Sequence, residues 1–149
     1  MKQNFFSFAV IAIIALGFGS HTFAQEVTIG DLKAKGGTVL SAEELKALLP
    51  GAIARYETAE FVYQQKFEPD GSSTGSWQRR LGGAQQMVQF SATWSIEDGR
   101  WCGIQRSYRS NEVVAKYCRD IINVGDKSYY ASGNRNNDGR TAYEIRFNK

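Results

Sequence analysis

The feature that most constrains the fold of this chain is a two-residue alternation that begins at Val88. Apolar side chains recur at every second position as far as Ile96, and mostly polar side chains stand between them. That period is typical of a β-strand with one face in the core. Asp98-Gly99 follows, and this pair favours a tight hairpin. The hairpin predicts one shared core face, formed by Val88, Phe90, Ala92, Trp94, Ile96, Trp101 and Gly103.

This first turn also fixes which residues lie opposite one another. It sets Ile96 opposite Trp101 and Trp94 opposite Gly103. We expect the missing side chain of Gly103 to leave room for the Trp94 indole. Side chains alternate across a strand, so the opposite face of the sheet is predicted to carry Cys102, Ile104, Arg106 and Tyr108.

The same register extends toward the C-terminus through three more reversals. A second hairpin near Ser110 places Cys102 directly opposite Cys118, and the chain turns again at Gly125-Asp126 and over residues 133–140. Each of these turns leaves the apolar side chains of the next strand on the same face of the sheet. The predicted fold is therefore mainly β: an antiparallel meander, either a small barrel or a curled sheet. Ile121 then lies opposite Tyr130. The side chains predicted to face inward are Val113, Ala115, Tyr117, Ile121, Tyr130, Tyr143, Ile145 and Phe147.

One short N-terminal helix is predicted at residues 42–49. Ser41 and Glu44 have the spacing of a capping box, in which each side chain bonds the backbone of the other. Residues 25–40 show no sustained period, so we expect a flexible lead-in with a short helix around residues 31–35.

Strand patterns occupy the chain between the helix and the alternation. The period changes to two at Tyr56, which predicts a strand over residues 56–67. A turn is predicted at residues 68–71, where Pro69 presets one backbone torsion. Residues 72–83 are rich in Ser, Thr and Gly and predict a short edge strand. The predicted single β domain thus spans residues 41–149.

Residues 1–24 have the layout of a cleavable secretion signal. Lys2 precedes an apolar run over residues 5–19, and small residues stand at the predicted cleavage site after Ala24. The run is shorter than the ~20 residues of a membrane-spanning helix, so we expect no stable membrane anchor, with an uncleaved anchor as the alternative. Cleavage leaves 149 − 24 = 125 residues, a single-domain length. The predicted location is periplasmic or secreted, in a bacterium.

The composition of the exported part limits the kinds of partner that we expect. Lys2 leaves with the signal, so 18 − 1 = 17 basic residues face 15 acidic ones, a net charge of about +2. So weak a charge disfavours a nucleic-acid partner. Cys102 and Cys118 would be joined in an oxidising compartment. With 15 residues between them, the bond stabilises the fold by about 3 kcal/mol in the chain-entropy account.

A set of short motifs resembles a family of exported proteobacterial proteins, the DUF995-like domains of unknown function. The resemblance covers roughly residues 36–132 and rests on a "G-x-W, DG-x-x-C, C" core. It implies export, a disulfide and a β meander, and it transfers no catalytic residue. The residues that carry it are Leu40-Ser41-Ala42-Glu43-Glu44-Leu45, Leu48-Leu49-Pro50-Gly51, Asp70-Gly71, Gly75, Trp94, Asp98-Gly99-Arg100-Trp101-Cys102 and Cys118.

The residue inventory excludes several chemistries. The single histidine, His21, lies in the predicted signal, so the exported part has no imidazole for a triad or a metal site. Paired cysteines remove thiol catalysis and thiolate zinc sites. Residues 134–139 resemble the start of a calcium loop, but the twelfth position is Ile145, so we interpret them as a hairpin loop. We expect no cofactor and no metal.

Tyrosine and arginine side chains on the face opposite the predicted core form the candidate binding site. Both residue types are enriched at binding hot spots. The alternative is that another element covers this face, so that the side chains only fill and rim it. The candidate residues are Arg106, Tyr108, Arg109 and Tyr129.

Three functional hypotheses follow from the sequence. The first is a non-enzymatic exported domain that binds a protein or an envelope component through that Tyr/Arg face. The second is a carrier of a small apolar ligand in a barrel lumen, lined by Trp94, Trp101, Tyr117 and Tyr143. The third is a weak hydrolase that pairs two carboxylates. The acidic candidates are Glu57, Glu60, Glu97, Asp98 and Asp120.

Overall fold

The structure is a computed structural model that describes residues 26–80 and 86–149. The predicted signal, residues 1–24, lies outside the described residues, as do residues 81–83 of the predicted edge strand. Neither of the two described helices is long and apolar enough to cross a membrane.

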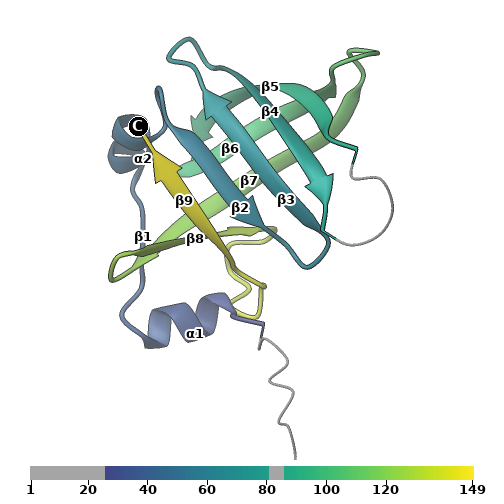
Figure 1. Ribbon diagram of the computed structural model, residues 1–149. Coiled ribbons are helices and arrows are strands. Elements are labelled where there is room, and N and C mark those ends of the chain that lie inside the picture. The colour runs from purple at the N-terminus through teal and green to yellow at the C-terminus, as the bar shows by residue number, and fades with distance from the viewer. Residues whose placement is uncertain (1–25, 81–85) are drawn as a thin grey trace, which may run out of the picture.

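The described strands form an antiparallel meander that closes on itself (Figure 1). Eight strands make the barrel, so the predicted mainly β meander is confirmed in its barrel form. The first strand of the barrel, β2 (Ile53–Glu57), pairs with its last strand, β9 (Tyr143–Asn148), and this pairing completes the ring. A two-residue strand, β1 (Thr38–Val39), adds to the outer end of β7. The barrel strands are β2 (Ile53–Glu57), β3 (Phe61–Phe67), β4 (Ser72–Arg79), β5 (Val88–Glu97), β6 (Arg100–Ser107), β7 (Val113–Val124), β8 (Lys127–Ser132) and β9 (Tyr143–Asn148).

The predicted register is confirmed through most of the C-terminal half. Ile96 lies opposite Trp101, and Cys102 lies opposite Cys118, to which it is joined by a disulfide. Ile121 lies opposite Tyr130. The disulfide therefore links β6 and β7 on the outer face, while the residues on either side of each cysteine point into the barrel.

The interior differs from the prediction at Gly103. Trp94 is its cross-strand partner, as expected, but the Trp94 indole N–H instead donates to the carbonyl oxygens of Glu68 at 3.0 Å and Ser72 at 3.1 Å. The ring of Tyr117 occupies the space over Gly103, where an added Cβ would lie 2.6 Å from it. The glycine is thus needed for a ring from the other neighbouring strand.

The prediction that Val113 faces inward is wrong. An irregularity between Gln105 and Arg106 shifts the pairing of β6 with β7, so that Val113 lies opposite Arg106 on the outer face. Val113 is 45% exposed. A bulge of this kind adds one unpaired residue and reverses the parity beyond it.

The predicted strands of the N-terminal half also need correction. The strand expected over residues 56–67 is two strands, β2 and β3, because the chain reverses at residues 58–60, where the Thr58 amide donates to the Phe61 carbonyl at 2.8 Å. Tyr56 still faces Tyr63 across this hairpin. The segment predicted as an edge strand becomes β4, which pairs with β3 and β5 and so has no free edge.

The helix α2 (Ala42–Leu48) forms as predicted and closes one end of the barrel (Figure 1). Its capping box is present, with Ser41 Oγ accepting from the Glu44 amide at 3.3 Å and Glu44 accepting from the Ser41 amide at 2.7 Å. Leu45 and Leu49 are fully buried and pack into the main core between the barrel strands.

The segment expected to be a flexible lead-in is packed against the barrel instead. It contains a second helix, α1 (Ile29–Ala34), which has its own capping box. Ile29 and Leu32 are buried against the outer face of β7 and β8 and against Ala142, the residue before β9. The amide of Ile29 also donates to the Arg140 carbonyl at 3.0 Å. Two apolar side chains on a single turn are too few for a periodic signal, so the sequence pattern did not predict this contact.

The end closure by α2 can be tested with Leu45→Ala. We expect the free energy of unfolding to fall by about 2 to 5 kcal/mol, because a fully buried leucine is replaced by a cavity. The exposed neighbour gives the matched control, and Lys46→Ala should change stability by no more than about 0.5 kcal/mol. Urea unfolding measures both. Equal effects would contradict the assignment of α2 to the core.

Candidate functional site

The structure does not bring the four predicted binding residues together. Tyr108 and Arg109 are exposed at the tip of the β6–β7 hairpin, and Arg106 donates to the Asn111 carbonyl at 3.1 Å there. Tyr129 lies opposite Ile122. That position is 122 − 113 = 9 residues along β7 from the tip, or about 30 Å at 3.3 Å per residue.

Tyr129 is also partly covered. It packs against the α1 cluster of Ile29, Leu32, Ile122, Ala131 and Ala142, as the alternative interpretation of this face expected.

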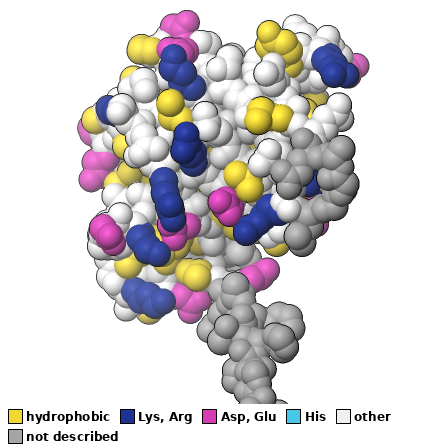
Figure 2. All heavy atoms as spheres, viewed as in Figure 1, with side chains coloured by type: hydrophobic (Ala, Val, Ile, Leu, Met, Phe, Trp, Pro, Cys, Tyr) yellow, Lys and Arg dark blue, Asp and Glu magenta, His cyan; other side chains and the backbone are white. Residues whose placement is uncertain are grey.

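Figure 2 shows acidic, basic and hydrophobic side chains interspersed over the visible face, above β9 and β2. The predicted Tyr/Arg face is therefore reduced to the exposed hairpin tip.

The interior of the barrel has two unlike halves. In the half next to α2, which we call the closed half, large inward side chains are buried almost completely. No more than 1% of each of them is exposed: Leu45, Leu49, Phe67, Trp101, Ile121 and Ile145. These residues form an ordinary hydrophobic core at that end of the barrel.

In the other half, the open half, inward-facing side chains keep part of their surface exposed. Their direction follows from the register, in which Phe61 faces Arg79 and Tyr63 faces Trp77 across β3 and β4. Ser132 lies opposite Arg119 but is exposed. The reason is that β8 ends at Ser132, so the first part of β7 pairs with β6 on one edge and with no described strand on the other. The partly exposed rings of the open half are Phe61, Tyr63, Trp77, Tyr117 and Tyr143.

This division corrects the lumen lining expected from the sequence. Tyr117 and Tyr143 line the open half, as predicted. Trp101 is fully buried in the closed half, and Trp94 lies at the same end with its indole N–H bonded to the backbone. Neither tryptophan is placed to contact a ligand entering from the open end.

Arg119 stands at the boundary of the two halves, surrounded by aromatic rings. Its guanidinium carbon lies 4.2 Å from the centroid of Tyr117, 4.6 Å from Tyr130, 4.8 Å from Trp101 and 5.0 Å from Tyr56. Ring faces attract a cation, and four such contacts help to keep the charge inside the barrel. Among the described residues, the buried Nε and Nη1 atoms of Arg119 have no hydrogen-bond partner.

The surroundings of Arg119 favour its charged form. Burial opposes the charge, but Tyr56 and Tyr117 outweigh that effect, so the pKa of Arg119 lies above its ordinary value. Burial in turn raises the pKa of Tyr117 and of Tyr130. The phenols of Tyr117 and Tyr130 are therefore neutral at physiological pH beside the charged guanidinium.

Sequence reasoning missed Arg119, although the pattern contained a signal for it. The predicted parity turns Tyr117 and Ile121 inward, and residue 119 stands between them at the same two-residue spacing. An arginine at a core-facing strand position is unusual, because a buried charge is costly without a partner. What the sequence could not supply is the set of rings around it, which come from four separate strands.

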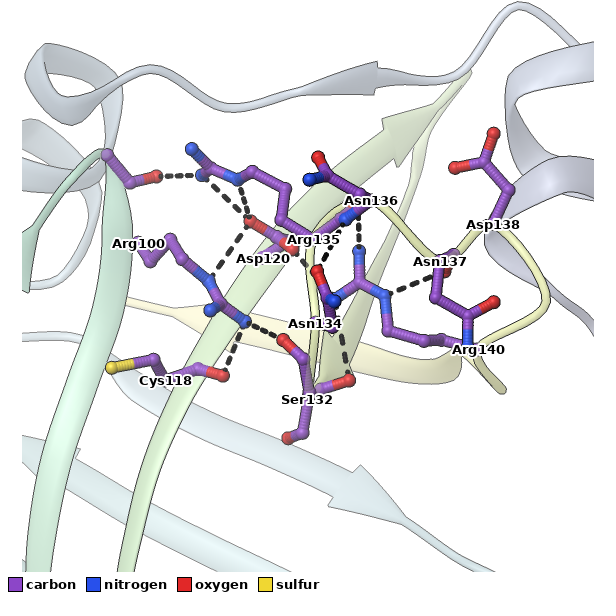
Figure 3. A network of polar contacts seen from close by, with 12 residues as sticks. Arg100, Cys118, Asp120, Ser132, Asn134, Arg135, Asn136, Asn137, Asp138 and Arg140 are labelled. Atoms are coloured by element: carbon purple, nitrogen blue, oxygen red, sulfur yellow. Dashed lines mark hydrogen bonds and ion pairs between the residues drawn. The ribbon is translucent and has the colours of Figure 1, made fainter.

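Asp120, the next residue, points outward and is held by three arginines (Figure 3). Its Oδ1 lies 2.8 Å from Arg135 Nη2 and 3.4 Å from Arg100 Nε, and its Oδ2 lies 2.8 Å from Arg140 Nη1. Arg135 Nη1 donates to the Asp98 carbonyl at 2.8 Å, and Nη2 also donates to the Gly99 carbonyl at 3.1 Å. This clasp ties β7 to the β5–β6 turn and to the loop over residues 133–142.

Several groups named for the other candidate chemistries already have partners. Among the acidic residues of the hydrolase hypothesis, Asp120 is held by three arginines, and Glu57 pairs with Arg80 at 3.0 Å. Within the loop over residues 134–139, the Asn134 and Asn137 side-chain oxygens accept from the loop's own amides. Glu97 approaches Cys102 and Cys118 closely enough to share a metal, but both sulfurs form the disulfide.

Comparison with known proteins does not identify a relative. The chain matches no family model, no curated protein and no solved structure. The resemblance to the DUF995-like proteins therefore stays a prediction, and the function has to be argued from the geometry.

The clasp can be tested with Asp120→Asn, which keeps the shape and removes the charge. We expect the free energy of unfolding to fall by about 3 to 5 kcal/mol, because the buried guanidinium of Arg140 loses its counter-charge. Glu144→Gln is the control, since Glu144 pairs with Lys127 and Arg146 at the surface and should cost at most about 1 kcal/mol. Urea unfolding compares them, and similar losses would argue against a buried clasp.

Proposed function

We propose that the protein binds a small, largely apolar ligand in the open half of the barrel. The single observation that carries this proposal is the contrast between the two ends. In the closed half Phe67 and Trp101 are fully buried, whereas the rings of the open half, Phe61, Tyr63, Trp77, Tyr117 and Tyr143, keep partial exposure. The interior of an eight-stranded barrel is either filled by its side chains or holds one small ligand.

The chemistry of the open half supports an apolar or aromatic ligand. Tyr56 stacks on Tyr63 with ring centroids 4.8 Å apart, and Phe61 meets Trp77 edge to face at 5.1 Å. Rings held in this way offer flat apolar surface at little further cost in conformational entropy. A few polar groups among such rings are typical of small-molecule sites.

An extracytoplasmic place of action is part of this proposal. The disulfide between Cys102 and Cys118 is of the kind that forms in oxidising compartments, and the predicted secretion signal points the same way. In that setting the protein would act as a carrier or a sensor of its ligand.

Binding can be tested with the neutral fluorescent probe N-phenyl-1-naphthylamine and the full exported chain. We expect saturable binding, and Trp77→Ala should weaken it about tenfold, because a ring that contacts the probe is lost. Gln78→Ala is the matched control, since Gln78 is the next residue on β4 and faces outward. Thermal melting checks that both variants fold. Unsaturable binding, or equal affinity in Trp77→Ala, would reject the site.

A second proposal retains the hairpin tip as a contact for a protein or an envelope component. The observation that favours it is the exposure of large apolar side chains there, with Tyr108 at 66%, Val113 at 45% and Val114 at 55%. Arg109 lies beside them and is also exposed. This combination of an aromatic ring and a guanidinium is common at binding hot spots.

The tip can be tested with the double variant Tyr108→Ala and Arg109→Ala. We expect it to melt like the wild type, since both side chains are exposed. It should also lose at least one envelope protein that the immobilised wild type retains and that binds the wild type directly after purification. Arg146→Ala, on the outer face of β9, is the control. Identical retention by all three proteins would count against the tip.

A further inference from the structure

The interior of the barrel holds a positive charge that no carboxylate neutralises. Arg119 faces inward opposite Trp101, and no acidic residue occupies an inward-facing position in the described strands. Asp120 is adjacent in the chain but lies on the outer face, where three arginines hold it. The charge inside is therefore stabilised by ring faces and by a side-chain hydrogen bond with Tyr56, and by no carboxylate.

Ring faces do not satisfy all the hydrogen-bond donors of a guanidinium. Arginine has five N–H donors and no acceptor, and aromatic faces accept hydrogen bonds only weakly. Within the described part of the chain, Nε and Nη1 of Arg119 and the indole nitrogen of Trp101 are buried donors without a partner. These unpartnered donors could be satisfied by a ligand group that is rich in oxygen acceptors.

A second cation lies in the open half of the barrel, at the end of β4. Arg79 occupies the inward-facing position opposite Phe61 at the end of β4, and its guanidinium carbon lies 5.8 Å from the Phe61 ring centroid. Arg79 is exposed, and Arg119 is partly exposed as a whole residue although its Nε and Nη1 atoms are buried. Two cations along one opening favour the approach of an anion.

We infer that the ligand is an organic anion whose carboxylate, sulfonate or similar oxygen group binds Arg119 while its apolar body lies against the rings of the open half. This inference rests on the proposed function and names the class of ligand. Arg119 is the residue that selects it, and Arg79 guides it inward.

Two fluorescent probes with the same body separate the inference from the proposed function. 8-Anilinonaphthalene-1-sulfonate is N-phenyl-1-naphthylamine with one added sulfonate. We expect the wild type to bind the sulfonate probe about tenfold or more tightly than the neutral one, as a charge-assisted hydrogen bond allows. Arg119→Met should abolish that preference and leave the affinity for the neutral probe within about twofold, whereas Arg119→Lys should retain part of it.

Arg55→Met is the matched control for the change in net charge. Arg55 is exposed on the outer face of β2, one residue before the inward-facing Tyr56, so the preference for the sulfonate probe should remain. If Arg119→Met fails to melt cooperatively, the wild-type comparison and Arg119→Lys decide. Equal affinity of the wild type for both probes would overturn the inference and leave the proposed function standing. Failure of both probes to bind would overturn the proposed function and the inference together.

Discussion

The structure depends on the pairing of β2 with β9, which turns a meander into a closed barrel. Ala54 meets Phe147 and Tyr56 meets Ile145 across this seam. Once the ring is closed, the two-residue period of every strand separates an interior from an exterior, and only β1 is left as a short edge beside β7. Whether each functional side chain points inward or outward then follows from its place in that two-residue period.

A barrel also has two ends, and α2 covers only one of them, which is why the interior divides into a buried half and an accessible half.

Local signals were enough to predict the register of the C-terminal half. The alternation from Val88, the Asp98-Gly99 turn and the two cysteines each restrict the pairing independently, and their agreement leaves one register. The errors occur where such signals are weak. The reversal at residues 58–60 contains neither glycine nor proline, so it was interpreted as continuous strand. The irregularity after Gln105 has no sequence signature, and it alone moved Val113 to the outer face.

The candidate site was harder to predict, because it depends on contacts between distant parts of the chain. The outward direction of Tyr129 was implied by the register, but its partial cover comes from α1, about a hundred residues earlier in the chain. The Asp120 clasp likewise joins arginines from β6 and from the loop before β9. The inward direction of Arg119 could be predicted from the parity of β7. The accessibility of its surroundings could not, since it follows from the early end of β8 and from the absence of a covering helix among the described residues at that end.

The choice of arginine at position 119 bears on how the interior is used. A buried charge without a carboxylate partner costs stability, and replacement by well-packed apolar residues is often neutral or stabilising. The closed half proves that this chain fills barrel space with leucine, isoleucine and phenylalanine where only packing is required. Proteins tend to depart from such local rules at functional sites. The four rings around Arg119 reduce the cost of the charge, while its buried Nε and Nη1 donors are left without a partner among the described residues. In the clasp, by contrast, the donors of Arg140 are satisfied by Asp120 and by the carbonyls of Asn137, Ser132 and Arg135. The contrast between these two arginines, one on each face of the same sheet, is the strongest physical reason to regard the open half as a binding site.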